Sequence, residues 1–202
     1  PELVEDVLRR VMRESYATQE HGFVCCRSGG GKVVVIGGAG ALGQRFVSLF
    51  RRSGYQVEVL EQADWPAAST ICANAALVLM AVPITLTEQL ISLLPALPAD
   101  CVLADLTSVK AKPLAAMLQQ HSGPVVGLHP MFGPDITNLV KQVVVVCHGR
   151  AEHDYQWLLK QLVVWGAELA FKAADEHDHA MQLIQAMRHF SSLVYGVHLA
   201  EE

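Results

Sequence analysis

The sequence lacks the features that would place it in a membrane or on nucleic acid. Its longest apolar-leaning stretch, 71–84, is interrupted by Asn74 and Pro83 and falls short of the roughly 20 residues that a membrane-spanning helix needs. The net charge is −5, and no run of five Lys or Arg residues occurs, which argues against nucleic acid or an anionic membrane as a partner. The N-terminus has no basic and then apolar segment, so we expect no signal peptide and a cytoplasmic location.

The sequence also lacks a pattern of metal ligands. It has five cysteines but no Cys-x-x-Cys spacing, and only Cys25 and Cys26 are adjacent. We therefore expect reduced thiols and no metal site. Histidines gather at Glu176–His179, but His177 and His179 lie about 200° apart on a helix and cannot share one ion. The simplest interpretation of that cluster is the acidic first turn of a helix.

What the chain does have is enough apolar sequence for a large core. It contains 202 residues, of which 51% are hydrophobic and 17% charged, so it is long enough for one complete domain and part of another. The pattern divides it into an amphipathic helix at 1–16, a Gly- and Ser-bearing linker at 17–31, an alternating α/β region at 32–173, and a long apolar helix at 174–202. The last helix needs partners to cover it.

The alternating region predicts a doubly wound, Rossmann-like α/β fold with a mostly parallel sheet. Most of its expected strands are uniformly apolar and do not alternate, as in sheets that helices cover on both faces. We expect strands at 32–36, 56–61, 75–82, 101–105, 124–128, 142–147 and 168–171, and helices at 41–53, 87–94, 113–121 and 152–165.

A glycine-rich turn follows the first strand and begins the first helix of this region. Gly38, Gly40 and Gly43 have the GxGxxG spacing, which allows a tight turn, close approach of a pyrophosphate and close helix packing. Glu61 ends the next strand, where a carboxylate can bind a ribose, and this favours NAD over NADP. The alternative is a sharp turn with a solvated strand end. Together with these residues, Ala41 and Leu42 complete the predicted cofactor site.

Two polar residues follow later strands at the edge where such sheets bind ligands. His129 lies just after a predicted strand and has the chemistry to accept a proton from a substrate hydroxyl. Ser108 occupies the loop after the preceding strand, where it is either a substrate contact or a helix N-cap.

A polar stripe also runs along the last predicted helix. Asp178, Gln182, Gln185 and His189 are spaced so that they share one face, which is either solvated or the wall of a site.

Several motifs in the sequence resemble a known enzyme family. The most specific is Gly127-Leu128-His129-Pro130-Met131-Phe132-Gly133-Pro134-Asp135, and others lie at 55–57, 60–62, 82–84, 105–110, 141–145, 165–167, 176–178 and 188–190. Through them the chain resembles the bifunctional chorismate mutase–prephenate dehydrogenases. Residues 1–16 resemble the last helix of the mutase domain, and 174–202 the start of a helical dimerisation domain.

The resemblance implies oxidative decarboxylation of prephenate to 4-hydroxyphenylpyruvate with NAD⁺, a step of tyrosine biosynthesis. It implies that His129 and Ser108 bind the reacting hydroxyl and that Lys110 and His189 bind substrate. Val82 and Pro83 would line the cofactor site. It also implies a homodimer and inhibition by tyrosine.

The resemblance leaves open whether this chain turns over substrate. The family's carboxylate-binding arginine and most of the mutase residues have no counterpart here, so we expect no mutase activity. Two alternatives are a cofactor-binding fragment without turnover and a related β-hydroxyacid or imine dehydrogenase. The latter would need a lysine on the 174–202 helix, which has none.

Overall fold

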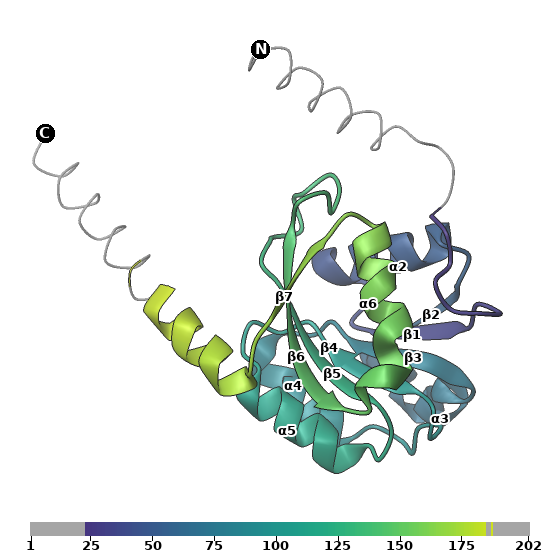
Figure 1. Cartoon of the computed structure of the whole chain (residues 1–202). Helices are drawn as coiled ribbons and strands as arrows, with labels where there is room; N and C mark the ends of the chain where they lie inside the picture. The colour runs from purple at the N-terminus through teal and green to yellow at the C-terminus, as the bar shows by residue number, and fades with distance from the viewer. Residues whose placement is uncertain (1–22, 185–186, 188–202) are drawn as a thin grey trace, which may run out of the picture.

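The computed structural model describes residues 23–184 and 187, and these contain one mixed sheet (Figure 1). Its strand order is β2-β1-β3-β4-β5-β6-β7. The first five strands of the chain are parallel, β6 runs antiparallel to β5, and β7 runs parallel to β6. The expected mostly parallel sheet is therefore confirmed. The strands are β1 (Lys32–Ile36), β2 (Gln56–Leu60), β3 (Ala75–Met80), β4 (Val102–Asp105), β5 (Val125–Pro130), β6 (Val143–Arg150) and β7 (Glu168–Phe171).

Helices cover both faces of the sheet and account for its apolar strands. On one face α2 (Ala41–Arg52) and α6 (Gln156–Val164) pack on a core that includes Val33 and Val35 of β1. Val34 and Ile36 point to the other face, which α3 (Ala68–Cys72), α4 (Ile84–Ser92) and α5 (Ala111–Gln120) cover (Figure 1). Because both sides of each central strand are buried, no polar alternation is seen in the sequence.

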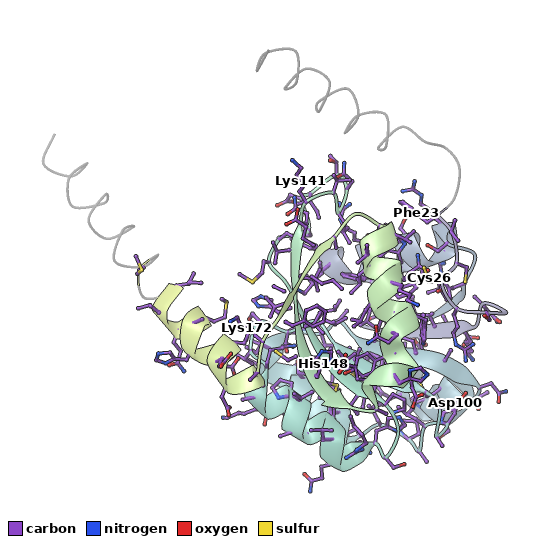
Figure 2. The ribbon with its side chains drawn as sticks, viewed as in Figure 1. Phe23, Cys26, Asp100, Lys141, His148 and Lys172 are labelled. Atoms are coloured by element: carbon purple, nitrogen blue, oxygen red, sulfur yellow. The ribbon has the colours of Figure 1, made fainter. Side chains whose placement is uncertain are left out.

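The chain enters the domain along the face formed by α2 and α6 (Figure 2). The Phe23 amide donates to the Arg52 carbonyl at 3.1 Å, and the Cys26 amide donates to Gln161 Oε1 at 3.0 Å. Tyr55 also donates its hydroxyl to Gln161, at 2.8 Å. The later part of the predicted linker is thus packed on the domain.

The topology creates a binding edge at the carboxyl ends of the parallel strands. From β1 the chain passes to β2 on one side and then to β3 on the other side of β1. The connections therefore diverge between β1 and β3, which is where open α/β sheets bind their ligands. The ends of β4 and β5 lie at the same edge because both strands are parallel to β3.

Two short helices were not predicted from the sequence, and some predicted ends of helices and strands differ from the observed ones. Residues 62–72 form the 3₁₀-helix η1 (Gln62–Ala67) and then α3, and the predicted helix at 152–165 begins as the 3₁₀-helix η2 (Glu152–Tyr155). A helix begins at residue 174, beside α5, and points away from the sheet (Figure 1). The predicted helix at 1–16 and the end of the one at 174–202 lie outside the described residues. No helix among the described residues is long and apolar enough to cross a membrane.

Candidate active site

A groove of about 530 Å³ opens at the divergence between β1 and β3. Four of the predicted cofactor residues, Gly40, Glu61, Val82 and Pro83, line it. They come from the turn after β1, the end of β2 and the turn after β3, so three segments distant in sequence meet at one place. Gly37 and Trp65 also line the groove, and sequence reasoning had singled out neither of them.

The glycine-rich turn is shaped by close approach of backbone to backbone. A Cβ on Gly43 would lie 2.3 Å from the Gly37 carbonyl oxygen, and a Cβ on Gly38 would lie 2.8 Å from the Val59 side chain. Gly37 has a φ of +78°, which favours glycine. Gly40 is the N-cap of α2 and makes no side-chain cap, so the first amides of α2, including those of Ala41 and Leu42, remain available to an anion.

Glu61 lies over this turn. Its carboxylate accepts a hydrogen bond from the Ala39 amide at 2.7 Å, and its own amide donates to Asp64 Oδ2 at 2.9 Å. The capping box with Asp64 fixes where the chain leaves β2. A carboxylate therefore stands beside the amides that would face a dinucleotide.

His129 is positioned by a strand and not by a loop. The sequence placed it after a strand ending at 128, but β5 continues to Pro130 because β6 pairs with it, with His129 opposite Val145. Its Nδ1 lies 2.8 Å from Nε2 of His177, and the two rings are nearly perpendicular. None of the described residues hydrogen-bonds Nε2 of His129. Burial lowers the pKa of His129 to about 4, aided by His177 and Lys110 and opposed by Asp178.

His177 and Asp178, on the helix that begins at 174, complete a chain of three side chains. His177 is buried, and its Nδ1 lies 2.8 Å from Oδ1 of Asp178. Burial acts to raise the pKa of Asp178, but hydrogen bonds from the Ala111 amide, His177 and the Lys110 amide outweigh it, so the pKa is lowered. Asp178 is therefore a carboxylate anion at neutral pH.

Asp178 also caps α5. Its oxygens accept from the Lys110 amide at 2.7 Å and from the Ala111 amide at 2.9 Å. Since Lys110 is the N-cap residue and makes no side-chain cap itself, the interpretation of Ser108 as the N-cap of this helix is wrong. Ser108 is half-buried, and none of the described residues hydrogen-bonds its hydroxyl.

Lys110 lies beneath the site and not at its surface. Its side chain is fully buried, and Nζ donates to Asp105 Oδ2 at 2.5 Å and to the Leu128 carbonyl at 2.7 Å. Burial lowers its pKa, and the Asp105 carboxylate opposes that shift. A direct contact between this ammonium and a substrate, which the family resemblance implies, is therefore not available in this structure. Instead Lys110 fixes the backbone next to His129.

The remaining predictions have mixed outcomes. His189 lies outside the described residues, so the prediction that it binds substrate is untested. From the sequence, His177 was assigned to an acidic helix turn and to the motif at 176–178 but was given no role in the site. Its position next to Asp178 is the signal that could have identified it. Among the described residues, no three His, Cys, Asp or Glu side chains are placed to hold one metal ion.

Comparisons with known proteins agree with this geometry. Residues 54–169 match the family model described as prephenate dehydrogenase, nucleotide-binding domain. The chain is 54% identical to the T-protein of Enterobacter agglomerans and 51% identical to that of Haemophilus influenzae, each over 203 residues. These alignments cover 100% of this chain but 54% of each relative, so the chain spans about half the length of the curated relatives it matches.

A solved prephenate dehydrogenase from A. aeolicus, in complex with hydroxyphenyl propionate and NAD⁺, has a similar fold. Its TM-score is 0.64 at 16% identity, over 79% of this chain and 70% of that one. The match to the family model spans more than half of the residues and therefore establishes the family. This chain belongs to the prephenate dehydrogenase family and carries its nucleotide-binding domain.

Proposed function

We propose that the chain carries the cofactor site and the proton-accepting residue of an NAD⁺-dependent prephenate dehydrogenase, which oxidises and decarboxylates prephenate to 4-hydroxyphenylpyruvate in tyrosine biosynthesis. The observation that carries the proposal is His129, whose Nε2 has no partner among the described residues. It stands at the same sheet edge as the groove lined by Gly40 and Glu61. A base beside a nucleotide groove is what oxidation of an alcohol requires.

The residues of the groove fit a dinucleotide. The available amides at the start of α2 suit a pyrophosphate, and Glu61 suits a ribose with a free 2′-hydroxyl while repelling a 2′-phosphate. The A. aeolicus relative, which shares the fold, was solved with NAD⁺. When bound here, the oxidised nicotinamide supplies the acceptor for the hydride that leaves the substrate.

His129 acts as the proton acceptor. Its lowered pKa keeps the imidazole neutral at pH 7, so Nε2 can accept the hydroxyl proton as that carbon is oxidised. Ser108, which precedes α5 on the neighbouring strand connection, donates a hydrogen bond to the same hydroxyl in this proposal. Loss of carbon dioxide then makes the ring aromatic, and the product phenol regains a proton from His129.

We also propose how this chain is organised. Residues 32–173 form the nucleotide-binding domain, 17–31 a linker after the last helix of a mutase domain at 1–16, and the helix from 174 begins a helical domain. In that arrangement His189 binds the substrate, two copies form a homodimer through the helical domains, and tyrosine is an inhibitor.

The direct test measures nicotinamide reduction after prephenate is added to the intact protein that carries this chain. We expect reduction of NAD⁺ but not of NADP⁺, and loss of turnover by orders of magnitude in His129→Asn with unchanged NAD⁺ affinity. His153→Asn is the matched control, because His153 is exposed. Binding of NAD⁺ without any prephenate-dependent reduction would favour a cofactor-binding protein without turnover. Full turnover in His129→Asn would exclude the proposed base.

A further inference from the structure

We propose that His177 and Asp178 are positioning residues that fix His129 in the tautomer able to accept a proton at Nε2. The proposal deepens the proposed function, on which its kinetic consequences rest. It depends on three side chains joined by two contacts: His129 Nδ1 to His177 Nε2, and His177 Nδ1 to Asp178 Oδ1, each 2.8 Å. Neither His177 nor Asp178 needs to touch a substrate.

The direction of the hydrogen bonds follows from Asp178. An ionised carboxylate can only accept hydrogen bonds. Oδ1 of Asp178 already accepts the Lys110 amide, and Oδ2 accepts the Ala111 amide, so both oxygens are held in place by α5. The nitrogen that faces Oδ1 must therefore carry a proton, which makes Nδ1 of His177 the donor. The opposite tautomer would direct the lone pair of Nδ1 at a carboxylate oxygen.

The tautomer of His177 in turn determines which nitrogen of His129 carries the proton. A neutral imidazole with a proton on Nδ1 has a bare Nε2, which can only accept. Nδ1 of His129 faces that atom, so it must be the donor. The proton of neutral His129 then resides on Nδ1, and Nε2 is left bare. This is the atom that none of the described residues contacts and that a substrate hydroxyl would meet.

The arrangement is held by packing as well as by hydrogen bonds. His177 is only 2% exposed, and its ring meets that of His129 at an interplanar angle of 82°. Rotation of His177 would break contacts at both of its nitrogens. Because Asp178 also caps α5, the same carboxylate fixes the backbone at Lys110, two residues after Ser108. One anion thus positions both residues that are proposed to contact the reacting hydroxyl.

The charges also balance when His129 works as a base. One proton leaves the substrate hydroxyl and binds Nε2 of His129, which then carries a positive charge. The Asp178 carboxylate, one ring further on, is the charge that stabilises this cation, and it does not need to be protonated itself. The proton returns from Nε2 to the phenolate of the product.

Nuclear magnetic resonance of ¹⁵N-histidine-labelled protein tests the tautomer without reference to turnover. At neutral pH we expect His129 with its proton on Nδ1, and exposed His153 as the internal reference. In His177→Phe, which removes the acceptor, we expect the proton of His129 to redistribute toward Nε2. A wild-type His129 protonated on Nε2 would overturn the proposal, and so would an unchanged His129 signal in His177→Phe.

Kinetics then separate positioning from folding. We expect His177→Phe to lower kcat by about 10-fold or more, with NAD⁺ affinity unchanged. Loss of the hydrogen-bond partner that orients a metal-bound histidine has an effect of this size. His177→Gln, whose amide oxygen can accept from His129, should recover part of kcat. The matched controls are His179→Phe and Asp175→Asn, since both side chains are exposed on the same helix. Wild-type kcat in His177→Phe, or no gain from Gln over Phe, would overturn the proposal.

The two tests also keep this proposal distinct from the proposed function. If the wild-type protein does not oxidise prephenate, the proposed function fails, while the resonances of His129 still decide which nitrogen carries the proton. If the wild-type protein is active but His129 is protonated on Nε2, the function stands and the role of His177 and Asp178 is wrong.

Discussion

Nδ1 of His129 lies 2.8 Å from Nε2 of His177, and this contact joins β5 to a helix 48 residues further along the chain. The strand belongs to the nucleotide-binding domain, whereas the helix points away from the sheet (Figure 1). The setting of the proposed base therefore depends on how that helix packs on the domain. Asp178 makes the same connection a second time, through the first amides of α5.

The pH dependence of turnover follows from this environment. The groups that face His129 are His177 and Asp178 from the helix and Lys110 from the start of α5. Burial, His177 and Lys110 lower the pKa of His129 to about 4, and the Asp178 carboxylate opposes that shift. Because the neutral form is the active one, kcat/KM should be constant at neutral pH and fall as the pH drops through about 4. A pH–rate profile over the range where circular dichroism shows folded protein measures this. An acid limb near pH 6.5 would contradict it.

Most of the fold could be predicted because local patterns determine it. Each predicted strand is present, and the central strands β1 and β3 are the continuous apolar runs that buried parallel strands favour. The turn at Gly38–Gly43 and the carboxylate of Glu61 were also recognisable, because dinucleotide binding requires them at a fixed spacing. In contrast, η1 and α3 were missed: Pro66 and the small residues around it give no helical periodicity.

The buried polar groups of the site could not be predicted in the same way. Lys110 and His177 are types of residue that a sequence places at the surface by default, and both are almost completely buried. Each is tolerated because of a partner: Asp105 for Lys110, and Asp178 with His129 for His177. Such pairings are set by the packing of distant elements, and no periodicity in the chain records them.

Removal of the Glu61 carboxylate should weaken cofactor binding and its selectivity. In Glu61→Ala we expect the Kd for NAD⁺ to rise about 10-fold or more, the cost of a lost hydrogen bond to a charged group. The preference over NADP⁺ should also fall, because no anion then repels a 2′-phosphate. Isothermal titration of both nucleotides measures these effects. Glu58→Ala is the control: Glu58 lies on β2, three residues before Glu61, but pairs with Lys32, 3.0 Å away. Equal losses in the two variants would contradict the assignment of Glu61.

Gly43→Ala should disrupt the glycine-rich turn between β1 and α2. The new Cβ would lie 2.3 Å from the Gly37 carbonyl oxygen and 2.9 Å from Cα of Gly38, so backbone must move. Overpacking of this kind costs about 1–3 kcal/mol, and here it also displaces the amides that would face the phosphates. We expect a lower Tm and lost NAD⁺ binding, measured by calorimetry. Gly133→Ala meets no atom within 4 Å and should change neither. Unaltered binding in Gly43→Ala would show that the turn is not used.

The buried pair of Lys110 and Asp105 should show strong coupling in stability. Lys110→Met leaves the Asp105 carboxylate buried without its cation. Oδ1 of the same carboxylate already has no hydrogen-bond partner among the described residues. Breaking a buried pair in this way costs about 3–5 kcal/mol, whereas replacing both charges together is often close to neutral. We therefore expect Lys110→Met to lower the free energy of unfolding in urea by that amount, and the double variant Lys110→Met/Asp105→Asn to recover most of it, since Asn keeps an acceptor for the Thr107 amide. Lys32→Met, which breaks the more exposed pair with Glu58, should cost less than about 1 kcal/mol. If the loss in Lys110→Met and the loss in Asp105→Asn alone simply add in the double variant, Lys110 and Asp105 do not stabilise each other, and the position of Lys110 beneath His129 has another cause.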